Sequence, residues 1–193
     1  MKDLMRVEKS ILDYEGMKAL KEITFAPYIY LATKLISKVR RSGGTMFRHQ
    51  ISTFGILLEY GYTDSVLLKA SLIHDAIEDL ENFDRELIRN CDADGDAVLK
   101  LVLEVTKREG ETKADFLKRI NSEGSYNAKA LKCSDRISNL IDLGYVTDKV
   151  FIERTCEETE LYILPIAIQV DYEMYQEIIS LILSRRKFLE INQ

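Results

Sequence analysis

The chain has 193 residues, of which 46% are hydrophobic and 31% charged, a balance that suits one globular domain with a sizeable core. Its 32 acidic and 27 basic residues leave a net charge of −5, which argues against a dedicated binder of nucleic acid or of an anionic membrane. With 2 prolines in the whole chain, the composition also excludes disordered and collagen-like proteins.

Long periodic segments separated by glycines, with few β-branched runs, predict an all-α protein of about eight to ten helices. In chain order we expect helices near residues 3–14, 26–41, 48–60, 64–80, 84–90, 95–108, 112–121, 126–143, 148–164 and 171–190. No repeat, low-complexity tract or proline-rich linker divides these segments. We therefore expect residues 1–193 to form a single domain.

The spacing of the cysteines and the composition of the first ten residues indicate the cellular compartment of the protein. Cys91, Cys133 and Cys156 are widely spaced and form no CxxC motif, which argues against a disulfide framework or a cysteine-rich zinc site. No stretch is long and apolar enough to span a bilayer, and the first ten residues lack the apolar core of a signal peptide. These features predict a cytoplasmic protein without a membrane partner.

The expected helix over 64–80 combines an apolar first half with an acidic second half. Its first two turns are apolar nearly all round, which is typical of a central, buried helix. Its second half carries His74, Asp75, Glu78 and Asp79. Acids at a helix C-terminus face the negative end of the dipole, at a cost of about 0.3–1 kcal/mol each when exposed. We therefore expect a cation to offset this charge.

The histidines are the first candidates for metal ligands. The chain has 2 of them, His49 and His74, and Asp75 directly follows the second. Asp135, on the expected helix over 126–143, is a further candidate. Neutral imidazoles and carboxylates together suit Mn²⁺, Fe²⁺, Co²⁺ or Zn²⁺. The alternative stays open on spacing alone, because a buried histidine is more often hydrogen-bonded in the core than bound to a metal.

Three further polar residues lie one helical turn from these candidates. Glu78 and Asp79 follow His74 and Asp75 at a spacing of four, which places them near a metal-bound water, where a carboxylate pair can move protons. Asn139 follows Asp135 by one turn and is expected to project toward the same cavity. The plainer interpretation is that the acids form a solvated helix face.

Five ordered segments resemble those of one enzyme family. They are Arg40-Arg41-Ser42-Gly43 before His49, HDAIED at 74–79, LVLEVTKRE at 101–109, LKCSDRISNL at 131–140 and EETELYILPIA at 157–167. Together they resemble the HD superfamily of metal-dependent phosphohydrolases, in particular the hydrolase domain of Rel/SpoT-type alarmone enzymes and the stand-alone small alarmone hydrolases. The resemblance covers about residues 26–170.

This resemblance implies an all-α HD-domain bundle that removes the 3′-pyrophosphate from guanosine penta- or tetraphosphate with one Mn²⁺ per chain. Other divalent transition metals stay open. The implied metal ligands are His49, His74, Asp75 and Asp135. The residues implied to activate the attacking water or to shuttle its protons are Glu78 and Asp79. Those implied to contact the nucleotide are Arg40, Arg41, Ser42 and Asn139. The implied partner is a small-molecule nucleotide, and self-association into a homo-oligomer stays open.

The chain departs from the family's usual residues at several positions. Arg41, Thr45, Met46 and Gln50 stand where lysine, proline, tyrosine and proline are usual. Asp142 stands where a threonine usually contacts phosphate, and an acid beside a pyrophosphate would repel it.

These departures keep two other interpretations open. One is an HD phosphohydrolase of another nucleotide or phosphoester, and the other is a nucleotide-binding sensor without catalysis. The presence of both Glu78 and Asp79 argues against the sensor, since binding alone does not require them. We expect no synthetase domain, because the rest of the chain is too short to hold one.

Overall fold

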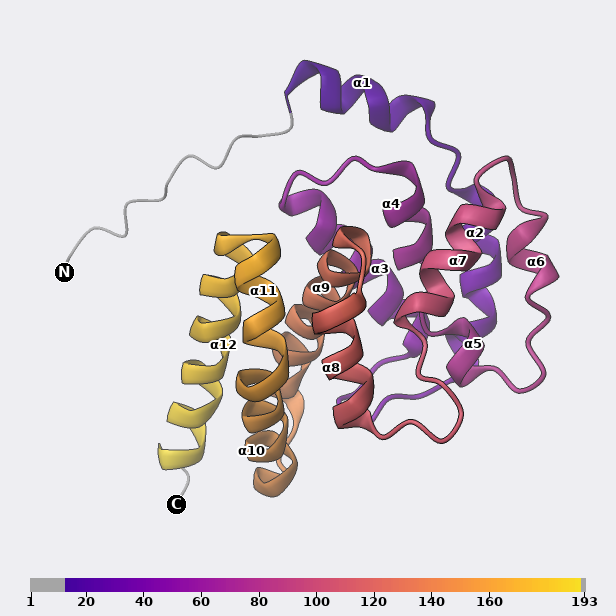
Figure 1. Ribbon diagram of the computed structural model, residues 1–193. Coiled ribbons are helices and arrows are strands. Elements are labelled where there is room, and N and C mark those ends of the chain that lie inside the picture. The colour runs from indigo at the N-terminus through magenta and orange to yellow at the C-terminus, as the bar shows by residue number, and fades with distance from the viewer. Residues whose placement is uncertain (1–12, 192–193) are drawn as a thin grey trace.

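The computed structural model describes residues 13–191, and Figure 1 shows them as helices joined by turns. The α-helices are α1 (Tyr14–Glu22), α2 (Ala26–Ala32), α3 (Met46–Glu59), α4 (Ser65–Ser71), α5 (Ala76–Asp79), α6 (Glu86–Arg89), α7 (Gly95–Val105), α8 (Lys113–Glu123), α9 (Tyr126–Asp142), α10 (Lys149–Glu158), α11 (Leu164–Val170) and α12 (Tyr172–Ile191). Two 3₁₀ helices, η1 (Thr33–Ser37) and η2 (Leu143–Tyr145), follow α2 and α9, and a π-helical turn, η3 (Thr159–Ile163), joins α10 to α11.

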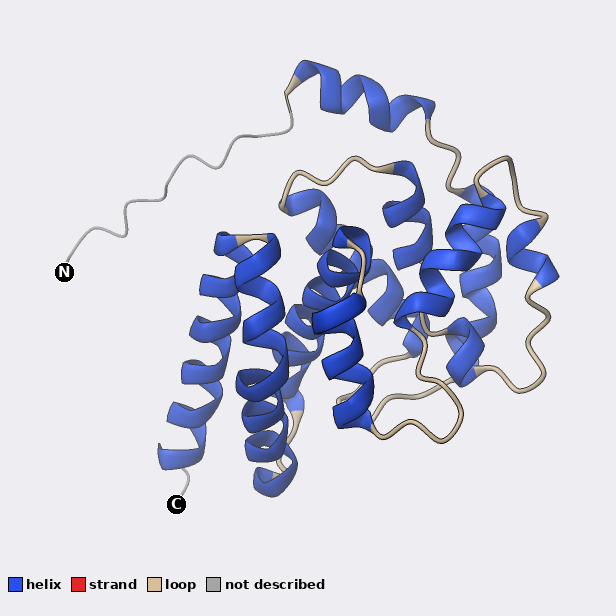
Figure 2. Ribbon diagram, in the orientation of Figure 1, coloured by secondary structure: helices blue, strands red, loops and turns tan. Residues whose placement is uncertain are grey.

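The expectation of an all-α fold is confirmed. Figure 2 shows no strand among residues 13–191, and their β-structure is limited to an isolated bridge between Val39 and Thr45. Within the same residues, no helix has both the length and the apolar character that crossing a membrane requires.

Helix α9 lies at the centre of the bundle. In Figure 1 it stands between α10–α12 on one side and the group of α2 and α4–α7 on the other, and it packs against α3, α7, α11 and α12. Its N-terminus is capped by Ser125, whose side chain accepts a hydrogen bond from the amide of Ala128. Buried apolar residues such as Leu131 and Ile137 join it to the core. Since the same helix carries Asp135, the core holds this candidate ligand in place.

The expectation of one continuous helix over 64–80 is wrong. Helix α4 ends at Ser71, and the chain turns before α5 begins at Ala76. The Nδ1 atom of His74 donates to the carbonyl of Ser71 at 2.9 Å, and this is the carbonyl that the amide of Asp75 would use in a continuing helix. The prediction that this segment is buried is confirmed, because Leu68 and Ile73 are completely buried.

Most other expected helices agree with the structure to within a few residues. These are the segments expected over 48–60, 84–90, 95–108, 112–121, 126–143 and 171–190. The helix expected over 26–41 ends earlier, because the chain leaves η1 and turns back through 38–45, where Gly43 and Gly44 have φ values of 89° and 72°. The helix expected over 148–164 continues through η3 and α11. The one expected over 3–14 lies almost entirely outside the described residues, and α1, which buries no residue, was not expected.

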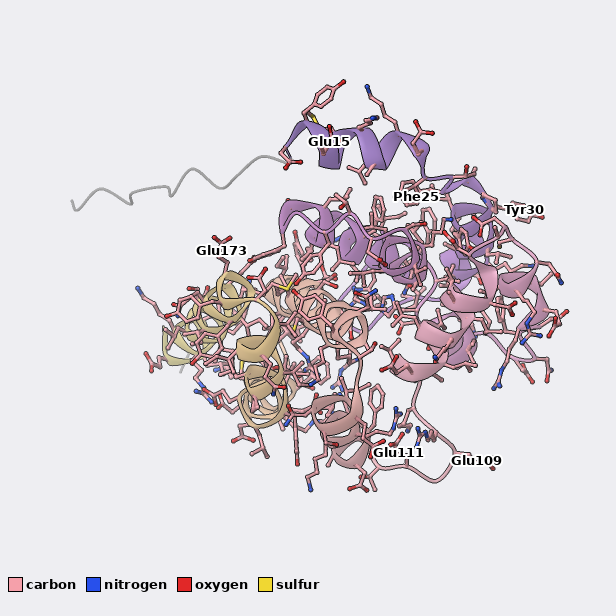
Figure 3. All side chains as sticks on the ribbon, turned by 45° about the horizontal axis from the view of Figure 1, so that its top comes forward. Glu15, Phe25, Tyr30, Glu109, Glu111 and Glu173 are labelled. Carbon is pink, nitrogen blue, oxygen red and sulfur yellow. The ribbon has the colours of Figure 1, made fainter. Side chains whose placement is uncertain are left out.

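Arg119 on α8 fixes the loop between α7 and α8. Its guanidinium donates to the carbonyls of Glu104 and Thr106 at 2.9 and 3.0 Å and to both carboxylate oxygens of Glu111 at 2.8 and 3.0 Å. Figure 3 labels Glu109 and Glu111 on this loop at the edge of the molecule. The backbone amide of Lys107, in the same loop, donates to Glu78. Arg119 therefore supports one wall of the region that carries the predicted catalytic acids.

We expect Arg119→Lys to lower the free energy of unfolding by about 1–3 kcal/mol, because an ammonium group cannot serve two carbonyls and both carboxylate oxygens at once. Urea denaturation at pH 7 measures this change. The control is Arg108→Lys on the same loop, whose side chain is exposed and should change stability by about 0.5 kcal/mol or less. Equal stability of the two variants would contradict the prediction.

Candidate active site

A pocket of about 390 Å³ opens beside α9, which is a size typical of small-molecule sites. Its lining residues are Arg40, Arg41, Ser42, Met46, His49, Asp75, Glu78, Asp79, Lys113, Lys132, Asp135, Arg136, Asn139, Leu143, Phe151, Arg154, Thr155 and Glu158. Every site residue expected from the sequence lines this pocket except His74, which is buried behind the wall with 4% of its surface exposed. The structure therefore brings the predicted residues together, although they come from four separate parts of the chain.

His49, His74 and Asp135 form a compact group in which the possible ligand atoms lie within 4.8 Å of one another. They come from α3, the turn after α4, and α9. Because Nδ1 of His74 donates to Ser71, Nε2 is the ring nitrogen that remains for a metal ion, and this buried atom makes no hydrogen bond. It lies 3.1 Å from Asp75 Oδ2 and 4.0 Å from Asp135 Oδ1. Two imidazoles and nearby carboxylates are a donor set that fits a divalent transition metal.

Asp75 lies at the edge of this group. Its Oδ2 is 3.6 Å from His49 Nε2, and it accepts a hydrogen bond from the Gln50 side chain at 2.8 Å. Gln50 is buried and stands where the family usually has proline. In this chain it therefore orients one of the predicted ligands, a role that the sequence did not indicate.

The other two candidate ligands are also held by hydrogen bonds. His49 has Nδ1 2.9 Å from Ser138 Oγ and Nε2 3.0 Å from Asp135 Oδ1. Asp135 accepts from Lys132 Nζ and from Asn139 Nδ2, both at 2.6 Å. Lys132 supplies part of the positive charge that the acids of this region require. Such supporting contacts commonly fix the orientation of metal ligands.

Neighbouring charges shift the pKa values of two members of this group. Burial favours the neutral form of Asp135, but Lys132 and His49 outweigh it and hold the pKa of this carboxyl well below its usual range. Burial alone would lower the pKa of His74, yet Asp75 and Asp135 raise it to about 9. The imidazole therefore carries a second proton, on Nε2, at neutral pH when no metal is bound. A metal ion must displace that proton, so we expect its affinity to fall as the pH decreases.

Glu78 and Asp79 lie on α5, the single turn that follows the break after α4. Burial, reinforced by the charges of Asp75 and Glu78, raises the pKa of Asp79 to about 6. Glu78 is more exposed, and its Oε1 accepts the hydrogen bond from the amide of Lys107. The two acids thus have different surroundings, which the sequence motif alone does not reveal.

The two arginines of the 40–43 segment also have different surroundings. Arg40 donates to Asp142 and, at 2.6 Å, to Asn139 Oδ1. Arg41 pairs with Asp148 and lies 4.3 Å from the centre of the Phe151 ring. Asp142 was expected to repel phosphate, but its carboxylate is paired with Arg40 and is not part of the pocket lining.

Sequence reasoning missed several charged residues of the pocket. Arg136 donates to Glu158 at 2.7 Å, and Lys113 lies 2.9 Å from the same carboxylate. Arg154 lines the pocket near Phe151. Of these, only Arg136 and Glu158 belong to segments that carried the family resemblance, where neither had been assigned a role.

An all-α bundle with a histidine and aspartate cluster at a pocket is what the resemblance to HD-type hydrolases implies. No protein-family model matches the chain. In sequence, 121 residues are 34% identical to the human guanosine-3′,5′-bis(diphosphate) 3′-pyrophosphohydrolase MESH1, covering 60% of this chain and 65% of that enzyme. The match thus spans less than two thirds of the relative's length.

A solved structure has the same fold. It is described as a metazoan ortholog of SpoT that hydrolyzes ppGpp and plays a role in starvation responses, and it superposes with a TM-score of 0.65 at 22% identity. The superposition covers 89% of this chain and 96% of the other. The sequence match confirms the resemblance to alarmone hydrolases that the five ordered segments predicted, and the superposition confirms the all-α fold.

We expect the purified protein to bind one divalent transition-metal ion per chain, and His74→Ala to abolish tight binding, because it removes the unpaired Nε2 ligand. At a hundredfold excess of metal over the dissociation constant, wild type should gain about 2.7 kcal/mol of stability. Elemental analysis and melting with and without a chelator test this. Identical melting temperatures, with no metal retained, would rule out the site.

We expect Asp79→Asn to stabilise the metal-free protein in a pH-dependent way. The carboxyl has an ordinary pKa of 3.8 and a folded pKa of about 6, so ionisation destabilises the fold, by an amount that grows between these values and is constant above them. The gain should be absent near pH 4 and about 1–2 kcal/mol at pH 7.5, allowing for solvent screening. Melting in chelator at both pH values measures it. An equal gain at both would exclude this ionisation as the cause.

Proposed function

We propose that the protein is a Mn²⁺-dependent guanosine-3′,5′-bis(diphosphate) 3′-pyrophosphohydrolase, which converts (p)ppGpp to GDP or GTP and pyrophosphate. The observation that carries the proposal is the cluster of His49, His74 and Asp135 beside a pocket that also contains Glu78 and Asp79. A binding protein without catalysis needs no pair of acids beside a metal site. The likeness to two ppGpp hydrolases supports the choice of substrate.

In this proposal His49, His74, Asp75 and Asp135 hold the metal ion. The mixture of imidazole and carboxylate donors suits Mn²⁺. A cation bound there would polarise a phosphoryl oxygen and lower the pKa of a water molecule. Gln50 and Lys132 keep the two aspartates in position through the hydrogen bonds described above.

Asp79 is the group best suited to take the proton from the attacking water. A general base works best when its pKa is close to the working pH, and the pKa of Asp79 is raised to about 6. Glu78 lies next to it on α5, and its carboxylate has one oxygen engaged with the amide of Lys107. Glu78 can therefore orient the water or relay the proton while it holds the adjacent loop.

The nucleotide would be bound by the remaining walls of the pocket. Arg41 and Ser42 belong to the loop before α3, and Arg40 and Asn139 remain predicted nucleotide contacts. The side chains of Lys113 and Arg154 add positive charge, which suits a ligand with several phosphate groups. The proposed partner is thus a small nucleotide and not a nucleic acid. A single hydrolase domain without a synthetase, a cytoplasmic location and the oligomeric state stay predictions.

A substrate panel tests the proposal. With Mn²⁺ present, guanosine 3′,5′-bis(diphosphate) should be hydrolysed with release of pyrophosphate, and a chelator should stop the reaction. Release of orthophosphate, or activity only on another nucleotide or phosphoester, would indicate a different HD phosphohydrolase. Binding of the nucleotide without turnover would indicate a sensor.

We expect Glu78→Gln to slow hydrolysis by about tenfold or more, since positioned acids and bases contribute about 10²–10⁴-fold to rates. Glutamine keeps an oxygen that can accept from the Lys107 amide, so the loop, the melting temperature and metal binding should be retained. Steady-state kinetics at saturating Mn²⁺, with metal content measured on the same samples, gives the answer. Unchanged kcat would show that Glu78 serves only as an anchor for the loop.

A further inference from the structure

A chain of polar contacts leads from Asp142, at the C-terminal end of α9, to a predicted metal ligand. Asp142 pairs with one guanidinium nitrogen of Arg40, and the other nitrogen donates to Asn139 Oδ1 at 2.6 Å. Asn139 Nδ2 then donates to Asp135 Oδ1, also at 2.6 Å. The same Asp135 oxygen lies 3.0 Å from His49 Nε2. The chain of contacts therefore ends at an atom that would face the metal.

The sequence builds this chain from two elements. Asp135, Asn139 and Asp142 recur on α9 at a spacing of four and three residues, which places them on one face of the helix. Arg40 comes from the turn over 38–45, where its amide donates to the Gly44 carbonyl at 3.2 Å and its carbonyl accepts from the Gly43 amide at 3.0 Å. This turn aims the guanidinium at α9, and the side chain is 9% exposed.

We propose that Arg40 is a positioning residue for the metal ligand Asp135, acting through Asn139 and held in place by Asp142. An amide can rotate by half a turn and exchange its oxygen and nitrogen. In one orientation the Asn139 oxygen faces Arg40 and its NH₂ group faces Asp135. The reverse orientation would place the oxygen against the Asp135 carboxylate, which is repulsive. Arg40 selects the first orientation, because a guanidinium can only donate.

Arg41 provides the natural comparison. It is the next residue along the chain and also pairs with an aspartate, Asp148, but the pair is exposed, at 59% and 42% of the two side chains. Its guanidinium lies over Phe151, and no contact joins it to the metal cluster in the part of the chain that is described. Arg41 thus has the same charge as Arg40 and the adjacent position in the chain, but it is exposed and has no link to Asp135.

Charge and positioning predict opposite effects when Arg40 is removed. Loss of the cation alone removes the nearer partner of Asp142 and leaves it a longer contact of 3.8 Å with Arg48, and the lost positive charge would strengthen metal binding. Loss of the positioning contact would weaken it, as the removal of contacts behind metal ligands commonly does. A double variant that removes both members of the ion pair keeps the net charge unchanged and isolates the positioning effect.

The experiment compares Arg40→Met/Asp142→Asn with Arg41→Met/Asp148→Asn. Each metal-free protein is titrated with Mn²⁺ in a calorimeter, without nucleotide. We expect the dissociation constant to rise by about tenfold or more in the first variant and to stay within about twofold of wild type in the second. Asparagine at 148 can still cap α10, where Asp148 accepts from the Phe151 amide, so the control should fold normally.

An equal effect of the two double variants on Mn²⁺ affinity, including no effect of either, would overturn the inference. Asn139→Ala removes the side chain that links Arg40 to Asp135, and it should also weaken Mn²⁺ binding by about tenfold. It decides the question if the first double variant does not fold, as judged by circular dichroism. The inference rests on the proposed metal site and not on the substrate. Wild type that binds Mn²⁺ but does not hydrolyse guanosine 3′,5′-bis(diphosphate) would therefore refute the proposed function and leave the inference standing.

Discussion

The buried carboxylate of Asp135 is the constraint on which the rest of the site depends. An ionised acid at 5% exposure is unstable in a protein core unless charges and hydrogen bonds compensate it. Lys132, His49 and Asn139 all contribute such contacts, and each comes from α9 or from α3 packed against it. The packing of these two helices therefore builds the polar centre of the molecule.

The compensation of Asp135 leaves Asp75 without a lysine or arginine partner among residues 13–191, so the cluster lacks positive charge when His74 is neutral. Asp75 is a second carboxylate beside the same histidines, and the pKa of His74 is raised because a proton there relieves the excess of negative charge. A divalent cation relieves it more completely, and the unpaired Nε2 of His74 is already directed at the site. The charges of the site therefore favour binding of a metal ion, and the proton on His74 competes with the metal for the imidazole nitrogen.

The sequence predicted the helices, and the residues that gather at the pocket, better than it predicted the connections between helices. Periodic apolar residues located α3, α7 and α9, since packing against a core imposes that period. The break between α4 and α5, where the His74 imidazole donates to the Ser71 carbonyl, was missed because such a side-chain contact leaves no trace in apolar periodicity. The break matters for chemistry, because it moves Glu78 and Asp79 from the end of a long helix to a separate turn.

The contacts that join distant segments could not be predicted from the sequence either, because they also leave no local pattern. Arg40 and Asp142 are 102 residues apart, and Glu78 and Lys107 are 29 apart, so no local pattern links them. From the sequence alone, Asp142 was expected to repel a phosphate group. In the fold it neutralises an arginine that is itself bonded to Asn139. A departure from a family's usual residue is thus interpretable only with its partner, since the pair and not the single residue determines the charge that a ligand meets.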